Sequence, residues 1–181
     1  PVWCVCGGGG AAARQQDAAV NFLESESPQV KVVDIPEYMD FHIVLDSGAA
    51  DHVVDNSQTP GYQVQESVGS KMGSCFVAAN GERIPNRGEV KLDMKSGSIP
   101  IKSTFQVSRI SRPLWSVGKL CDAGYSVTFN KNDAHVTHIE TGKKVGKFER
   151  QQGLYIGNFR LRNVEAAGRL PKESSQTGGK S

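Results

Sequence analysis

The sequence predicts an all-β domain with one short helix, and three observations support this class. Short runs rich in β-branched and aromatic residues recur through the middle of the chain, and Gly- or Asn-containing turn sequences separate them. Gly124 is a helix-stop signal, and residues 117–122 before it are the expected helical turn. The 38% hydrophobic content of the 181 residues is enough for one modest β-rich core.

The first predicted strand ends abruptly in a carboxylate. The run Ile43-Val44-Leu45 is apolar throughout, which predicts a strand buried on both faces, and Asp46 follows with no polar transition. A carboxylate there is costly to ionise unless hydrogen bonds or a function offset the cost. The following Ser47-Gly48 supplies a hydroxyl and a backbone that can turn amide N–H groups toward the carboxylate, although an ordinary Asp-initiated turn is an equal alternative.

The next elements are a hairpin and an alternating strand. Residues 76–84 predict two strands that flank the turn Asn80-Gly81, which is the strongest short hairpin signal. Residues 90–94 alternate apolar and polar side chains and predict a strand with one apolar face. A further apolar segment, residues 114–116, precedes the short helix.

Four more short strands are predicted after the helix, at residues 125–129, 135–139, 145–148 and 154–159. Turn sequences join them, so they predict a C-terminal β-meander. The sequence leaves open whether this meander forms an interface, covers an edge strand or acts as a spacer.

Composition divides the chain into three parts. Residues 1–38 contain a glycine run and an alanine/glutamine stretch that build no core, and they predict a disordered linker. Residues 39–162 carry the predicted strands and form the expected domain. Residues 163–181 are rich in Gly, Ser and Lys and predict a disordered tail.

No metal or other cofactor is expected. Cys4 and Cys6 have the wrong spacing for a zinc site and no histidine follows them. His135 and His138 would point to opposite faces of a strand, so they do not form a metal-binding pair.

Charge and cysteine content restrict the partners and the setting. A net charge of +2 gives no electrostatic footprint for nucleic acid, and no apolar run approaches the length of a membrane helix. Four cysteines do not make a disulfide framework and no signal peptide is visible, so we expect an intracellular, cytoplasmic setting.

Several motifs occur in the order found in one known family. The chain closely resembles the protease region of copia-type LTR retrotransposon polyproteins, a group of retropepsin-like aspartic proteases, over roughly residues 40–160. The matching motifs are Asp46-Ser47-Gly48-Ala49, Ala79-Asn80-Gly81-Glu82, residues 114–120, residues 123–129 and Gly153-Leu154-Tyr155. The resemblance implies a closed β-barrel of the acid-protease fold.

The resemblance also implies an activity, cleavage of a Gag-Pol-like polyprotein. Peptide hydrolysis by such enzymes needs two carboxylates that share a proton beside one water. The chain has one Asp-Ser-Gly, and the similar tripeptide Glu140-Thr141-Gly142 is better explained as a hairpin turn. The second carboxylate would then be Asp46 of another copy, so the enzyme would be a homodimer with a coupled pair of pKa values.

Other site residues follow from the resemblance by position. Ser47, Gly48 and Ala49 would support the active-site loop, with Ser47 bonding across the dyad. Polypeptide substrate would contact Asp51, Asn80, Gly81 and Trp115, although Asp51 fits a solvated turn equally well and Trp115 fits a core position better. His52 could be a subsite residue, although its place after a turn fits an ordinary surface histidine better.

A β-hairpin flap would close over the substrate, and residues 76–92 are the candidate. Its tip could be Asn80-Gly81 or residues 86–88.

A second functional class stays open beside the protease. A catalytically silent retrotransposon-derived barrel could act as a structural or interaction module. The intact Asp46-Ser47-Gly48 favours the enzyme, whereas a monomer with Asp46 alone would favour the module, because one carboxylate cannot carry out this reaction.

Overall fold

The computed structural model describes residues 35–167, which include the whole expected domain 39–162. Most of the expected linker, residues 1–34, and most of the expected tail, residues 168–181, lie outside the described residues. The described chain is dominated by β-strands, which confirms the all-β class.

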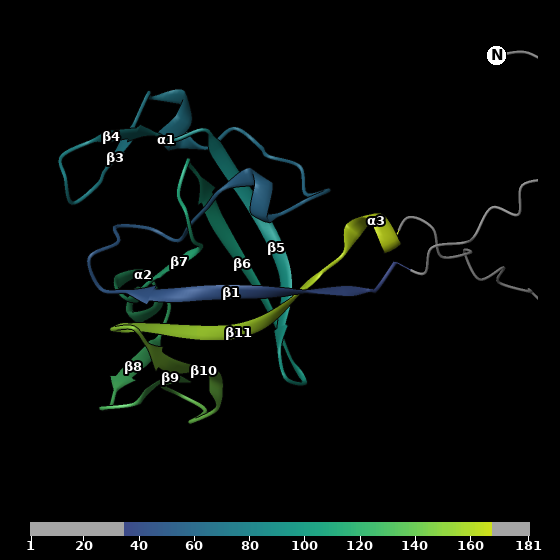
Figure 1. Cartoon of the computed structure of the whole chain (residues 1–181), viewed down its shortest axis with the longest axis vertical. Coiled ribbons are helices and arrows are strands. Elements are labelled where there is room, and N and C mark those ends of the chain that lie inside the picture. The colour runs from purple at the N-terminus through teal and green to yellow at the C-terminus, as the bar shows by residue number, and fades with distance from the viewer. Residues whose placement is uncertain (1–34, 168–181) are drawn as a thin grey trace, which may run out of the picture. The chain divides into compact units, whose positions relative to one another are not determined.

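The strands range from two to nine residues in length (Figure 1). They are β1 (Tyr38–Asp46), β2 (Val53–Val54), β3 (Cys75–Val77), β4 (Arg83–Pro85), β5 (Gly88–Ser96), β6 (Ile99–Val107), β7 (Leu114–Ser116), β8 (Tyr125–Phe129), β9 (Asp133–His138), β10 (Lys144–Gln151) and β11 (Leu154–Arg162).

The helices are α1 (Val68–Lys71), α2 (Val117–Asp122) and α3 (Val164–Ala167), with a 3₁₀ turn at Asn56–Gln58. The predicted helix coincides with α2, and Gly124 follows it with φ 83°. The single turns α1 and α3 were not predicted. α1 forms because Ser67 and Ser70 each accept a hydrogen bond from the other's backbone N–H, a capping box made of serines alone.

β1 occupies the middle of the main sheet. It runs antiparallel to β11, from Tyr38 opposite Arg162 to Leu45 opposite Tyr155. Its last residues run parallel to β7, which places Asp46 opposite Ser116. The remaining strands follow in the order β1-β7-β2-β6-β5-β11, and the pairing of β11 with β1 returns the series to its start.

The hydrophobic core is built from buried residues of the main sheet and of α2. The alternation predicted for residues 90–94 is confirmed, because Val90, Leu92 and Met94 are buried on one face of β5. Trp115 is 3% exposed and packs edge-on against Phe159, with ring centroids 5.3 Å apart. The structure therefore places Trp115 in the core.

The C-terminal meander forms as predicted and belongs to the same core. β8, β9, β10 and β11 pair in sequence, and Val136 and Phe148 are completely buried. Gly157 permits this packing, since a Cβ there would lie 2.6 Å from the rings of Phe148 and Phe159. No helix among residues 35–167 is long and apolar enough to cross a membrane.

Candidate functional site

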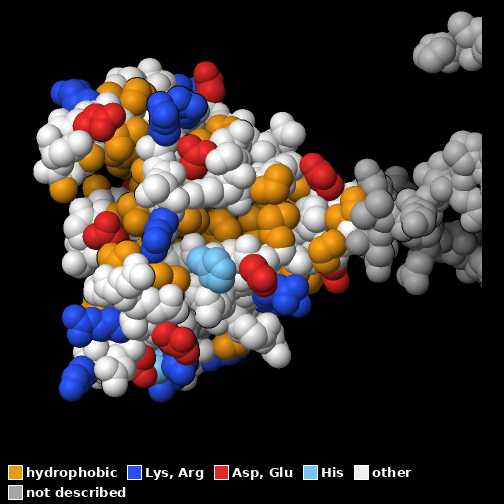
Figure 2. Space-filling view, viewed as in Figure 1, with side chains coloured by type: hydrophobic (Ala, Val, Ile, Leu, Met, Phe, Trp, Pro, Cys, Tyr) orange, Lys and Arg blue, Asp and Glu red, His pale blue; other side chains and the backbone are white. Residues whose placement is uncertain are grey.

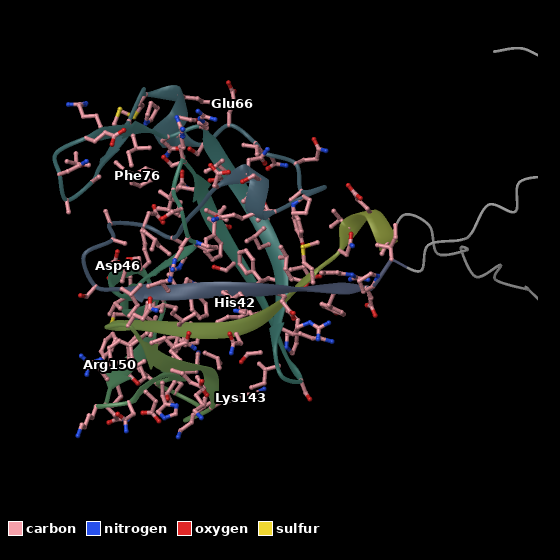
Figure 3. All side chains as sticks on the ribbon, viewed as in Figure 1. His42, Asp46, Glu66, Phe76, Lys143 and Arg150 are labelled. Carbon is pink, nitrogen blue, oxygen red and sulfur yellow. The ribbon has the colours of Figure 1, made fainter. Side chains whose placement is uncertain are left out.

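Asp46 stands at the end of β1, where the strand leaves the sheet between β7 and β11 (Figure 3). Its Oδ1 accepts a hydrogen bond of 2.8 Å from the backbone N–H of Gly48. A Cβ on Gly48 would lie 3.4 Å from this oxygen, which is an ordinary van der Waals contact, so space alone does not require a glycine there. The expected turn of an amide toward the carboxylate is confirmed, and Ser47 is exposed beside it.

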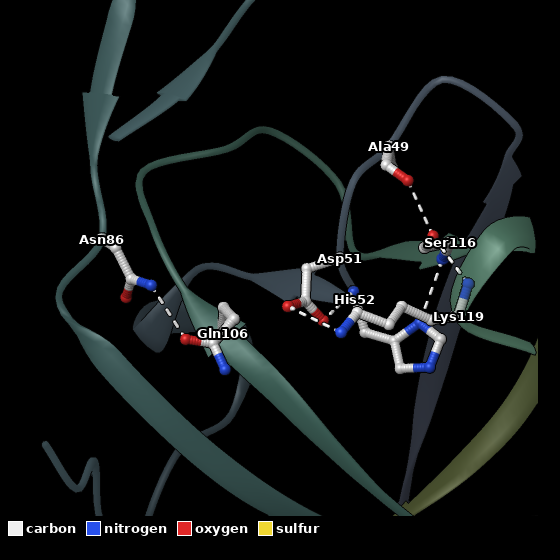
Figure 4. A network of polar contacts seen from close by, with 7 residues as sticks. All are labelled: Ala49, Asp51, His52, Asn86, Gln106, Ser116 and Lys119. Atoms are coloured by element: carbon white, nitrogen blue, oxygen red, sulfur yellow. Dashed lines mark hydrogen bonds and ion pairs between the residues drawn. The ribbon is translucent and has the colours of Figure 1, made fainter. Parts of the chain in front are cut away.

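A buried serine holds the loop that follows Asp46. Ser116 is 0% exposed, and its Oγ donates a hydrogen bond of 2.7 Å to the carbonyl oxygen of Ala49. The same Oγ accepts the backbone N–H of Lys119 at 3.2 Å and so caps α2 (Figure 4). One hydroxyl therefore joins the loop, β7 and the helix.

His52 makes a second connection from the loop to β7. Its Nδ1 accepts the backbone N–H of Ser116 at 3.0 Å, and its ring packs against Phe105 and Trp115. Burial lowers the pKa of His52 from 6.5 to about 4; Asp51 acts in the opposite direction, and the ammonium of Lys119 adds to the lowering. The ring is therefore neutral at pH 7, as an acceptor must be.

The expectation that His52 is an ordinary surface histidine was wrong. The ring is partly buried and hydrogen-bonded, and its partner is 64 residues away in the sequence. No local pattern around His52 indicates such a partner, because the contact depends on how β7 packs beside the loop.

Asp51 contacts the loop backbone and α2, and it also faces a cavity. Its Oδ1 accepts the N–H of His52 at 2.9 Å, and its Oδ2 lies 3.7 Å from the Nζ of Lys119. The ion pair is partly exposed, so its contribution to stability is at most about 1 kcal/mol. The carboxylate also lines a cavity, described below.

The β3–β4 hairpin stands apart from the main sheet as a two-stranded sheet of its own. Its tip is the turn at Asn80-Gly81, where Gly81 has φ 83° and Asn80 Oδ1 accepts the N–H of Glu82 at 3.0 Å. Of the two turns considered for the tip, Asn80-Gly81 is the one that closes the hairpin. Both of its residues are exposed.

Residues 86–88 form the base of this hairpin instead. Asn86 Nδ2 donates to Gln106 Oε1 at 2.8 Å (Figure 4), and Asn86 Oδ1 accepts the N–H of Gly88 at 2.9 Å. Gly88 has φ 134°, and a Cβ there would lie 2.3 Å from the carbonyl oxygen of Gln65. A single amide side chain therefore fixes the point where the hairpin leaves the sheet.

A cavity of about 370 Å³ lies between the loop after Asp46 and the hairpin. It is lined by Ala50, Asp51, Ser67, Val68, Gly69, Ser74, Cys75, Phe76, Asn86, Glu89 and Gln106. Figure 2 shows the surface hollowed below the hairpin. A larger groove of about 530 Å³ runs beside β1 past His42 and Arg112, but neither Asp46 nor the hairpin lines it.

The sequence Glu140-Thr141-Gly142 is a hairpin turn, as expected. It lies between β9 and β10, with Gly142 at φ 65° and its N–H bonded to the carbonyl of His138. Among the described residues, no group of three or more His, Cys, Asp or Glu side chains could hold a metal ion.

The chain was compared with family models, curated proteins and solved structures, and none of them matches it.

Proposed function

We propose that this chain is one subunit of a homodimeric aspartic endopeptidase of the retropepsin type. Its substrate would be a polypeptide, the Gag-Pol-like polyprotein of a copia-type retrotransposon, processed inside the cell. The ring of strand pairings from β1 to β11 is compatible with the closed β-barrel of such enzymes.

One observation carries the proposal, namely the setting of Asp46. The carboxylate ends a buried strand, accepts the N–H of Gly48, and belongs to a loop fixed to β7 by Ser116 and His52. A carboxylate held in this way has the fixed position that acid–base catalysis requires. The cavity between this loop and the β3–β4 hairpin would receive the polypeptide as an extended strand.

Hydrolysis would use Asp46 from both subunits. A two-fold axis beside Asp46 would bring the carboxylates together around one water, with one of them protonated. The ionised carboxylate would take a proton from the water as its oxygen attacks the scissile carbonyl, while the protonated one donates a hydrogen bond to the carbonyl oxygen. Transfer of a proton to the amide nitrogen would then release the amine.

The test compares the wild-type chain with Asp46→Asn. Cleavage of a random peptide library is measured between pH 4 and 7, beside the sedimentation of each protein. We expect concentration-dependent dimers and cleavage that disappears in D46N. Asp122→Asn is the matched control, because Asp122 is exposed on α2 and its carboxylate has no ion pair within the described chain.

Two results would contradict the proposal. Cleavage that survives in D46N would assign the reaction to other groups. A monomer without cleavage at any concentration would favour the alternative, a catalytically silent barrel that acts as an interaction module.

A further inference from the structure

The cavity below the β3–β4 hairpin has walls of mixed character. Val68 and Phe76 come from α1 and β3, and Ala50 comes from the loop after Asp46. The polar lining includes Glu89 of β5 and Gln106 of β6, besides Asp51, Asn86 and two serines, Ser67 and Ser74. A long side chain in this cavity would therefore meet both apolar surface and polar groups.

Glu89 is held in a defined position on this wall. It pairs with Gln106 across the β5–β6 ladder, and cross-strand partners point to the same face of a sheet. Its backbone N–H and C=O both bond to Gln65, each at 2.8 Å. Gln106 in turn accepts the amide of Asn86. The backbone of Glu89 is thus held between β6 on one side and Gln65 on the other.

The charge of the cavity is negative. Its only charged lining residues are Asp51 and Glu89. Asp51 has the ammonium of Lys119 at 3.7 Å, whereas Glu89 has no cationic group within 4.0 Å among residues 35–167. Glu89 is also partly buried, which weakens its screening by solvent. A carboxylate in such a place attracts a cation more strongly than an exposed one.

Lysine and arginine match this combination, because their aliphatic stems pack on apolar surface while their charged ends reach a polar group. We propose that the cavity is a subsite for a basic side chain of the polypeptide, and that Glu89 is the carboxylate that binds it. The inference rests on the proposed protease function, which places the substrate between this loop and the hairpin. In a two-fold dimer, the subsite would occur once on each side of the scissile bond.

The first experiment measures substrate preference. A peptide cleaved by the wild-type enzyme is varied one position at a time to Lys, Gln or Glu, and kcat/KM is determined for each peptide. We expect a position on each side of the scissile bond where Lys exceeds Gln about tenfold. Glu89→Gln should remove this preference, and Glu89→Lys should reverse it in favour of Glu.

The matched control is Glu66→Gln. Glu66 lies two residues before α1, is exposed and pairs with Lys71 at the surface, and does not line the cavity. It should keep the wild-type preference. Thermal unfolding of each variant establishes that it is folded before kinetics are compared.

A second experiment separates this inference from the protease itself. Binding of fluorescent Lys- and Gln-peptides is measured by anisotropy on D46N and on the double variant D46N/E89Q. Tighter binding of the Lys-peptide that depends on Glu89 supports the subsite even if no cleavage occurs. Cleavage whose Lys preference is absent, or unchanged in E89Q, overturns the subsite and leaves the protease standing. If the protein shows no cleavage and no Glu89-dependent binding of the Lys-peptide, the subsite and the protease proposal are both overturned.

Discussion

The Nδ1 atom of His52 accepts a hydrogen bond of 3.0 Å from the backbone N–H of Ser116. The carbonyl oxygen of His52 accepts the N–H of Gln106 at 2.8 Å, so the same residue is bonded to β6 as well as to β7. Asp46 lies six positions before His52 and is paired with Ser116 across β1 and β7. His52 therefore fixes the far end of the candidate catalytic loop to the same strand beside which the loop begins.

Replacing His52 with alanine should destabilise the fold. The change leaves the buried N–H of Ser116 without its acceptor and removes a ring packed on Phe105 and Trp115, so we expect a loss of about 2–4 kcal/mol in the free energy of unfolding. Urea denaturation measures this free energy for each variant. His52→Asn is the control, since its Oδ1 can take the place of Nδ1, and it should be less destabilised by about 1 kcal/mol or more. Equal losses would show that the hydrogen bond contributes little.

Stability should fall as the pH is lowered from 7 to 5. The pKa of His52 is lowered to about 4 in the folded state, against 6.5 for the free side chain, so in this range the unfolded chain binds a proton that the folded chain does not. The stabilising effect of neutral His52 is complete above pH 6.5 and is lost as the pH approaches 4. Urea midpoints of D46N and D46N/H52N, which both lack the Asp46 carboxylate, test this dependence on pH. The double variant should show the smaller decrease, and parallel curves would contradict the account.

The hydroxyl of Ser116 should matter as a cap. Ser116→Ala removes the acceptor for the Lys119 N–H and the donor to the Ala49 carbonyl, so the free energy of unfolding should fall by about 1–2 kcal/mol. Ser126→Ala is a matched change at an exposed serine with one long contact of 3.4 Å, and it should cost at most about 0.5 kcal/mol. Equal losses of unfolding free energy in the two variants would show that the Ser116 hydroxyl does not stabilise the fold as a cap.

Asn86 should control the motion of the β3–β4 hairpin. Asn86→Ala breaks the bonds to Gln106 and Gly88, so backbone amides in Cys75–Pro85 should exchange with solvent about fivefold faster, while those of β5 and β6 keep their rates. Hydrogen exchange read by mass spectrometry resolves the two regions. Asn132→Ala, at an exposed position in the meander, should leave the exchange rates of both regions unchanged. Faster exchange throughout β5 and β6 would mean that the variant loosens the whole sheet.

Local patterns in the sequence predicted the elements that depend on local physics. The helix at Val117–Asp122 was expected before the stop signal Gly124. The Asn80-Gly81 turn was predicted because this dipeptide favours a left-handed backbone, although the sequence left two turns open for the tip of the flap. The strand leading to Asp46 was found because Ile43-Val44-Leu45 is apolar on both faces, and all three residues are buried.

Features that depend on distant contacts were missed. The pairing of β1 with β11 joins Tyr38 to Arg162, and the bond from His52 to Ser116 spans the loop and several strands. The helical turn α1 has only serines as its capping signal, and glycine within it lowers its intrinsic propensity. Glu89 likewise looks like any polar residue of an alternating strand, because nothing in the local sequence shows that it lines a cavity with residues of α1 and β3.

A mixing experiment tests the shared dyad most directly. Wild-type protein is held at a fixed concentration at which it sediments as a dimer, and D46N is added while peptide cleavage is followed. If the dyad uses Asp46 from two subunits, mixed dimers are inactive, and a ninefold excess of D46N should reduce cleavage to about a tenth. An unrelated protein at the same concentration should have no effect. Cleavage that stays constant as D46N is added would show that each subunit acts alone and would contradict the account.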